Sequence, residues 1–182
     1  MNVIGISGSL RARSYNTALL RACQALAPGS MTLGVVSIDG LPVYNEDMEA
    51  QFPTQVRELR EAIAKADGVI LAVPEFNRGP SGAIKNFLDW TSRPESEQNP
   101  WARKPVAVFG CSSGPRGASF AQYDIRRTLH YFDAAVMNQP ETYIGVVQDK
   151  FDDAMNLTDE RTKTQLQKFL SAFAAHMAAH SK

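Results

Sequence analysis

The chain has 182 residues, which is most simply one domain, 1–182, and long enough to bury a hydrophobic core. Its 19 basic residues balance 19 acidic ones. A formal charge of zero argues against a nucleic-acid partner, which would require a basic surface. It also argues against a dedicated electron carrier, which would use a field of one sign for steering.

Cysteine and histidine usage excludes further classes of protein. Cys23 and Cys111 lie far apart in the sequence and indicate neither a disulfide framework nor a metal site. His176 and His180 lack the acidic context of a zinc-binding helix, so we expect no metal. The N-terminal residues show no basic segment followed by a long apolar run, and no run is long enough to span a membrane. We therefore expect a cytoplasmic protein with no membrane partner.

Short apolar runs alternate with amphipathic stretches along the chain. In order, we expect a strand at 3–6, a helix at 16–26, a strand at 33–38, a helix around 56–63, a strand at 69–73, a helix at 81–90, a strand at 106–109, a helix at 120–132, a strand within 134–147 and a helix at 158–179. Thr158 is the expected N-cap of the last helix. The segment 93–103 is polar and flanked by prolines, which predicts a surface loop.

This alternation predicts an α/β three-layer sandwich, a parallel sheet with helices on both faces. In such sheets, ligands bind beyond the carboxyl ends of the strands. Two loops, 5–16 and 74–80, each follow an expected strand. Both should therefore lie at the edge where a ligand would bind.

The loop 5–16 has the composition of a phosphate site. Gly5 and Gly8 permit a turn, which is surrounded by the short polar side chains of Ser7, Ser9, Ser14 and Asn16. The loop leads into a helix, whose N-terminal N–H groups and positive dipole end suit an anion. Arg11 and Arg13 add charge for a terminal phosphate. The alternative is a serine-rich loop that only caps the helix.

Spacing argues against other phosphate-binding motifs. The loop has neither the G-x-G-x-x-G of a dinucleotide-binding fold nor the G-K-[ST] of a P-loop. A receiver domain would need acidic residues where Ser7 and Pro74 stand. The C-x5-R loop of a small phosphatase is one residue longer than the stretch from Cys111 to Arg116.

The segment Pro74-Glu75-Phe76-Asn77 suits the isoalloxazine ring of a flavin. Phe76 offers flat apolar contact, and the backbone groups of Glu75 and Asn77 could bond the polar edge of the ring. The alternative for Phe76 is ordinary core packing. We expect the Glu75 carboxylate to bond N–H groups of the turn rather than to act as a general acid or base.

A third polar loop, 111–117, follows the strand at 106–109. Gly114 and Gly117 permit close backbone approach. Successive N–H groups here could face the ring edge where negative charge accumulates on reduction, which would raise the flavin potential. Arg116 could assist there, bind the phosphates of a nicotinamide donor, or be solvated. Cys111 is expected to be a small buried residue rather than a redox thiol.

With these loops assigned, the chain resembles the NADPH-dependent FMN reductase family, in particular its quinone and chromate reductase branch. The resemblance rests on G-S-L-R-x-x-S-Y-N at 8–16, L-P-V-Y-N-E-D at 41–47, A-D-G-V at 66–69, P-E-F-N at 74–77, K-N-x-x-D-W-x-S-R at 85–93, K-P-V at 104–106 and the loop 111–117. It implies a flavodoxin-like fold, a five-stranded sheet in the order 2-1-3-4-5, and bound FMN. It further implies hydride transfer from NADPH or NADH to quinones, free flavin or other small-molecule acceptors such as chromate.

Carried over by position, the family's cofactor-binding residues fall into two groups. The phosphate group comprises Ser9, Leu10, Arg11, Ser14, Tyr15 and Asn16, and the ring group comprises Pro74, Glu75, Phe76, Asn77, Cys111, Ser112, Ser113, Gly114, Arg116 and Gly117. No protein group is expected as catalytic acid or base, because the flavin carries the chemistry. The chain departs from the family at Phe76, where tyrosine is common, at Gly79, where a larger residue is common, and at Ala118, which replaces a second glycine. These departures bear on acceptor preference.

The resemblance also implies a homodimer or homotetramer with the flavin near a subunit boundary. We expect Trp90, Trp101 and Tyr44 to contact a second subunit, with core packing of the tryptophans as the alternative. The rival function is a non-enzymatic flavoprotein, either an electron carrier or a flavin-responsive binding protein. Such a protein would bind FMN but oxidise NAD(P)H no faster than free flavin.

Overall fold

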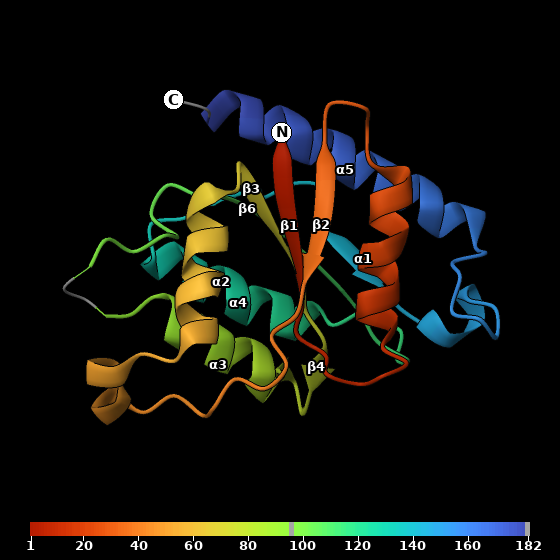
Figure 1. Ribbon diagram of the computed structural model, residues 1–182. Helices are drawn as coiled ribbons and strands as arrows, with labels where there is room; N and C mark the ends of the chain where they lie inside the picture. Colours follow the sequence, from red (N-terminus) through yellow and green to blue (C-terminus); the bar gives the residue numbers. More distant parts are fainter. Residues whose placement is uncertain (95–96, 181–182) are drawn as a thin grey trace.

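The computed structural model describes residues 1–94 and 97–180, and it has the expected α/β architecture (Figure 1). The main sheet is parallel, in the order β2-β1-β3-β6-β7, and β8 also pairs with β6. Its strands are β1 (Asn2–Ser7), β2 (Thr32–Val36), β3 (Gly68–Ala72), β6 (Pro105–Cys111), β7 (Ala135–Val136) and β8 (Thr142–Ile144). The predicted strand order is confirmed.

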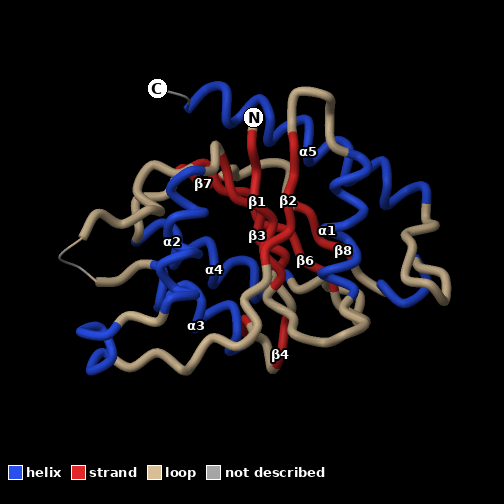
Figure 2. The backbone as a smooth tube through the Cα atoms, viewed as in Figure 1, coloured by secondary structure: helices blue, strands red, loops and turns tan. Residues whose placement is uncertain are grey.

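The fifth strand of the predicted sheet is divided in two. β7 pairs with the start of β6 and β8 pairs with its end, so both short strands share one neighbour (Figure 2). Pro140 lies between them, and a proline cannot donate a hydrogen bond to the ladder. The prediction of a single strand within 134–147 is therefore wrong in number, although its place in the sheet is correct.

Helices cover both faces of the sheet: α1 (Tyr15–Leu26), α2 (Thr54–Lys65), α3 (Gly82–Thr91), α4 (Ser119–Tyr131) and α5 (Glu160–His180). One buried cluster joins the sheet to α1 and α5, and a second joins it to α2, α3 and α4. Neighbouring residues of β3 point to opposite clusters, Ile70 to the first and Leu71 to the second. Both are fully buried, which explains why this strand is continuously apolar.

The N-terminus of α5 is capped one residue later than predicted. Asp159 Oδ2 accepts hydrogen bonds from the Thr162 hydroxyl (2.5 Å) and from the Thr162 N–H (2.8 Å). These bonds, the hydroxyl first, lower the pKa of the Asp159 carboxyl. The Thr158 hydroxyl instead donates to the Lys150 carbonyl at 3.2 Å. The prediction that Thr158 is the cap is therefore wrong.

The two tryptophans are completely buried within the subunit, so the prediction that they contact a second subunit is wrong. Trp101 Nε1 donates to Thr91 Oγ1 at 3.0 Å, and its ring packs edge-on against Phe87. Trp90 lies edge-on to Tyr44, with ring centroids 5.0 Å apart. The predicted surface loop 93–103 therefore sends one large aromatic side chain inward; residues 95 and 96 of that loop lie outside the described residues.

Candidate functional site

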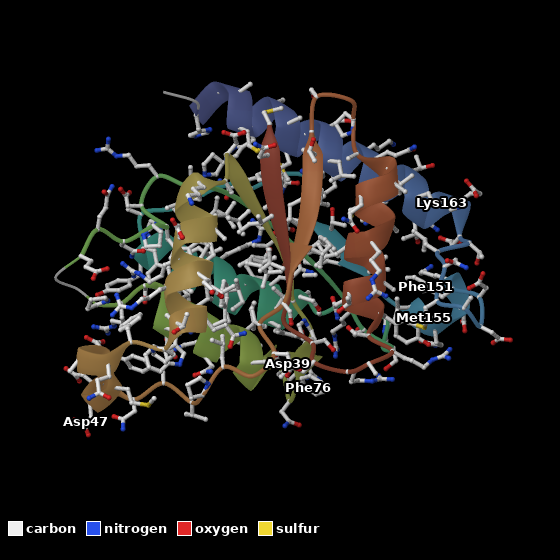
Figure 3. The ribbon with its side chains drawn as sticks, viewed as in Figure 1. Asp39, Asp47, Phe76, Phe151, Met155 and Lys163 are labelled. Atoms are coloured by element: carbon white, nitrogen blue, oxygen red, sulfur yellow. The ribbon has the colours of Figure 1, made fainter. Side chains whose placement is uncertain are left out.

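The three predicted loops meet at the carboxyl edge of the sheet. They are the loop between β1 and α1, the hairpin of β4 (Glu75–Phe76) and β5 (Gly79–Pro80), and the loop between β6 and α4. Figure 3 shows Phe76 below the ends of the strands, where the hairpin projects from the sheet. The loops enclose a cavity of about 150 Å³, lined by Ser9, Arg11, Ser14, Tyr15, Asn16, Pro74, Glu75, Phe76, Cys111, Ser112, Ser113 and Val147. Every lining residue except Val147 is a predicted site residue.

Hydrogen bonds between the loops hold this arrangement. Asn16 Oδ1 accepts from the Cys111 N–H at 3.2 Å, which joins the first loop to the third. Ser81 Oγ donates to the Gly8 carbonyl at 2.6 Å while it caps α3 by accepting from the Ile84 N–H. At Gly8, an added Cβ would lie only 2.8 Å from Ile84 Cβ. Ser81 was not predicted, because its role depends on a contact far away in the sequence.

The loop before α1 combines capping with free donors. Ser14 is the N-cap of α1, and its Oγ accepts from the Thr17 N–H at 3.2 Å. The capping alternative is therefore correct for Ser14. Within the described chain, however, the Ser9 hydroxyl and the Arg11 guanidinium have no hydrogen-bond or ion-pair partner. Arg13 turns away and donates to the Asp153 carbonyl at 2.9 Å. The free donors beside the helix N-terminus suit an anion.

Glu75 has a structural role. Its Oε2 accepts from the N–H groups of Phe120 (2.9 Å) and Ala121 (3.2 Å), at the N-terminus of α4. The residue at the N-cap position of that helix is Ala118, which has left-handed backbone geometry and no side chain able to cap. The prediction that the carboxylate bonds N–H groups is confirmed, but these groups belong to α4 rather than to the turn.

The hairpin presents an aromatic ring to the cavity. Phe76 is 58% exposed, so the alternative of core packing is wrong. The next two residues, Asn77 and Arg78, have φ values of 51° and 66°, as in the type I′ turns that favour tight hairpins. Asn77 therefore shapes the turn, and it is not among the residues that line the cavity.

Close packing and a hydrogen bond at the backbone of Gly117 hold the loop between β6 and α4 in place. Gly117 has a φ of 58°, and an added Cβ would lie 2.4 Å from the Ile144 nitrogen. Gln122 Nε2 donates to the Gly117 carbonyl at 3.1 Å. Within the described chain, the N–H groups of Ser113 and Gly114 have no acceptor. These two groups remain available for the polar edge of a ring.

Some predicted residues lie outside the cavity. Leu10, Asn77, Gly114, Arg116 and Gly117 are not among its lining residues. Leu10 lines a neighbouring cavity of about 530 Å³, which shares Ser9 and Arg11 with the first. Cys111 does line the site, and burial raises the pKa of its thiol to about 12. The thiol is therefore protonated at neutral pH, as expected of a small buried residue.

Two further sequence motifs turn out to be structural. Asn86 Nδ2 and Trp90 Nε1 both donate to the Pro42 carbonyl, at 2.9 and 2.8 Å. Asn86 Oδ1 accepts from the Tyr44 N–H at 2.8 Å. The motif of α3 therefore anchors the loop 41–47, which follows β2, and neither motif contributes to the lining of the cavity.

Size alone does not identify the site. A larger cavity of about 710 Å³ lies between β8 and α5 and contains no predicted site residue. Across residues 1–94 and 97–180, no cluster of histidine, cysteine and acidic side chains could hold a metal ion. In the same part of the chain, no helix is long and apolar enough to cross a membrane.

A parallel sheet in this order, with a loop of serines and arginines before α1 and an aromatic hairpin beside it, is the architecture of a flavodoxin-like protein. The chain belongs to the NADPH-dependent FMN reductase family, whose model matches residues 1–149. It is therefore an oxidoreductase that uses FMN, with NAD(P)H as the electron donor.

Relatives extend over nearly the whole chain. An NAD(P)H-dependent FMN reductase of Pseudomonas aeruginosa is 41% identical over 173 residues, which are 94% of this chain and 92% of that protein. A 2-hydroxy-1,4-benzoquinone reductase of a Burkholderia species is 39% identical over 96% of this chain and 95% of its own length. The structure of a flavoenzyme NAD(P)H:(acceptor) oxidoreductase from Paracoccus denitrificans aligns with a TM-score of 0.90 and 37% identity, covering 98% of both chains.

Proposed function

We propose that this chain is an NAD(P)H:quinone oxidoreductase whose FMN binds in the cavity between the three loops. Free flavin and chromate would be further acceptors. The observation that supports this proposal most is the convergence of the loops on one cavity. Its lining includes an exposed Phe76 ring and the side chains of Ser9 and Arg11, which have no partner among the described residues. Relatives named as quinone reductases support the choice of acceptor.

Each loop has a separate binding role in this proposal. Ser9, Arg11 and the first N–H groups of α1 would hold the phosphate, and Phe76 would lie against the ring. The N–H groups of Ser113 and Gly114 would face its polar edge. Bound FMN supplies the hydride-accepting and hydride-donating chemistry. No side chain is assigned as acid or base, since Glu75 already binds the N-terminus of α4.

The small size of the cavity supports exchange of reactants at one open face. About 150 Å³ is less than the roughly 300–1,000 Å³ of pockets that enclose a ligand. A ring bound there would stand partly outside the enclosed volume, beside the exposed Phe76. Donor and acceptor could then occupy the same face in turn, which is the basis of a ping-pong mechanism.

Stopped-flow reduction under anaerobic conditions tests this function. The FMN-loaded protein should be reduced by NADPH or NADH far faster than free FMN, and a quinone should then reoxidise it. Slow reduction by both donors would instead establish the rival, a non-enzymatic flavoprotein. The cofactor extracted from the protein should be FMN, because the donors of the loop suit a terminal phosphate. Recovery of FAD would contradict that assignment.

The proposal includes a homodimer or homotetramer in the cytoplasm. The tryptophans no longer support it, but α4 does: Tyr123 is 57% exposed and Tyr131 is 81% exposed. Eight residues apart, they lie on one face of the helix, and a second copy would cover both. The two buried free thiols are compatible with a reducing compartment. Light scattering should give at least twice the monomer mass, and Tyr131→Ser should lower it.

A further inference from the structure

We propose that Arg78 and Arg116 form a cationic clamp that binds the phosphate groups of the nicotinamide donor at the mouth of the site. The inference rests on the proposed function, because it assigns the donor to that site. Arg78 lies in the turn of the hairpin, and Arg116 lies in the loop before α4. Both elements also supply residues to the cavity lining, Phe76 from the hairpin and Ser113 from the loop.

One aromatic ring holds both guanidinium groups. The Cζ atoms of Arg78 and Arg116 lie 5.1 and 5.8 Å from the centroid of the Phe120 ring. Phe120 is 43% exposed, and its N–H is fixed by the Glu75 carboxylate at 2.9 Å. Cation–π attraction can hold a guanidinium within about 6 Å of such a ring. The arrangement therefore gathers two positive charges on the first residues of α4.

Acidic side chains among the described residues do not neutralise the charge of the clamp. Within the described chain, neither Arg78 nor Arg116 forms an ion pair with an acidic side chain. The nearby carboxylate of Glu75 accepts two hydrogen bonds from α4 instead. The positive end of the α4 dipole adds to the same field. Two like charges on one ring repel each other, and an anion between them would remove that repulsion.

The chemistry of the reactants indicates which one the clamp serves. NADPH and NADH carry phosphates outward from the nicotinamide ring, whereas simple quinones are neutral. Guanidinium groups present paired donors that match phosphate oxygens. The FMN phosphate would lie at the other loop, beside Ser9 and Arg11, which leaves the clamp for a second phosphate-bearing molecule. At one open face, the clamp would favour a phosphate-bearing nucleotide over a neutral acceptor.

Charge-neutral variants measured with three donors test the clamp. The variants are Arg78→Gln, Arg116→Gln and the double variant. Arg57→Gln is the matched control, because Arg57 Cζ lies 5.6 Å from the Phe52 ring, away from the cavity. Stopped-flow reduction gives the donor Kd and the limiting rate for NADPH, for NADH and for uncharged 1-benzyl-1,4-dihydronicotinamide. Titration with oxidised NADP⁺ gives a Kd that does not depend on turnover, and absorbance gives the FMN content.

The double variant should raise the Kd of NADPH and of NADP⁺ by about tenfold or more. Its limiting rate, its FMN content and its Kd for the uncharged donor should change less than about twofold, as should all values for Arg57→Gln. Added salt should weaken NADPH binding in the wild type and have a smaller effect in the double variant. A larger loss of affinity for NADPH than for NADH would place the 2′-phosphate in the clamp. Equal losses of affinity for the two donors would place the pyrophosphate there.

Other outcomes would overturn the clamp. If affinity for the uncharged donor fell as much as affinity for NADPH, the arginines would only shape the site. If the Kd values of NADPH and NADP⁺ did not change, the arginines would be solvated. Unchanged donor binding with slower reoxidation by a sulfonated naphthoquinone, but not by benzoquinone, would assign them to an anionic acceptor. Failure of the proposed function is distinguishable, because the wild-type flavin would then not be reduced rapidly by either nucleotide.

Discussion

Phe52 and Phe120 each lie beneath two arginine side chains, with similar geometry. The Cζ atoms lie 5.6 and 6.0 Å from the Phe52 centroid for Arg57 and Arg60, and 5.1 and 5.8 Å from the Phe120 centroid for Arg78 and Arg116. Around Phe52, the charge of Arg60 is used within the fold. Arg60 is only 9% exposed, and it forms an ion pair with Glu97 at 3.0 Å.

Backbone carbonyls accept further hydrogen bonds from Arg60. Its Nη1 donates to the carbonyl of Thr91 at 3.0 Å and to that of Arg93. No comparable partner satisfies the two arginines over Phe120 within the described chain. A guanidinium over an aromatic ring is thus a feature of both regions, and only the surrounding acceptors separate a structural cation from one available to a ligand. We therefore expect substitution of Arg60 to lower the stability of the fold, and substitution of Arg78 or Arg116 to weaken ligand binding.

The largest expected loss of stability is that of Trp101→Ala, close to Arg60. Trp101 is fully buried and bonds Thr91, whose carbonyl also accepts from Arg60. Loss of this side chain should lower the free energy of unfolding by about 3–5 kcal/mol, measured in urea with FMN present. Trp101→Phe should lose less and keep the native molecular mass in light scattering. A dissociated but fully stable Trp101→Phe protein would restore the subunit-contact interpretation.

Arg60→Met should lower the free energy of unfolding by about 3 kcal/mol, because buried carbonyls lose a charged donor. Arg78→Gln and Arg116→Gln should change it by less than about 0.5 kcal/mol, since their side chains are exposed. Urea denaturation of the three variants gives a direct contrast. Equal losses of unfolding free energy in the Arg60 variant and in the Arg78 and Arg116 variants would contradict the comparison.

Arg11→Ala tests whether another arginine that lacks a partner within the described chain also binds a ligand. Loss of one charge-assisted bond should weaken FMN binding by roughly tenfold to a hundredfold, or about 1.5–3 kcal/mol. The protein should purify with less flavin but retain its fold by circular dichroism. Arg13→Ala is the control, because Arg13 bonds the Asp153 carbonyl and not the cavity. Unchanged FMN affinity in Arg11→Ala would leave the loop with its capping role alone.

A smaller effect is expected for Glu75→Gln, close to the Phe120 ring. The amide can still accept from the N–H groups of α4, but it lacks the charge that favours a helix N-terminus. The free energy of unfolding, measured by urea denaturation, should fall by about 1 kcal/mol or less. A loss of turnover without loss of stability would contradict the structural role and make Glu75 a participant in catalysis.

Local pattern was sufficient to predict the five helices, the strands β1, β2, β3 and β6, and the three loops. Serines, arginines and glycines after an apolar run indicate the proposed phosphate loop, because strand, turn and helix N-terminus can each be recognised within a dozen residues. Ser81, Gln122 and Val147 were missed, since each acts through a contact made only in the folded chain. Trp101 was misassigned because a polar loop gives no local sign that one of its side chains packs inward.

The same limit applies to the edge of the sheet. The apolar run within 134–147 predicts a strand, but its division around Pro140 depends on the ladder with β6. At the N-terminus of α5, Thr158 and Asp159 are both good caps, and the bond to Lys150 decides between them. The arginines over Phe120 come from two segments that are distant in the sequence. The sequence therefore left several roles open for Arg116 and did not predict that Arg78 lies beside it.

The high pKa of Cys111 bears on the reactants themselves. Quinones are electrophiles that add to thiolates, and a thiolate beside the flavin would be alkylated by the molecules that the enzyme is proposed to reduce. Cys111 is 3% exposed, and burial raises the pKa of its thiol to about 12. At neutral pH the sulfur is therefore the weakly nucleophilic thiol. Burial at the end of β6 thus lowers the reactivity of this thiol toward the proposed quinone acceptors.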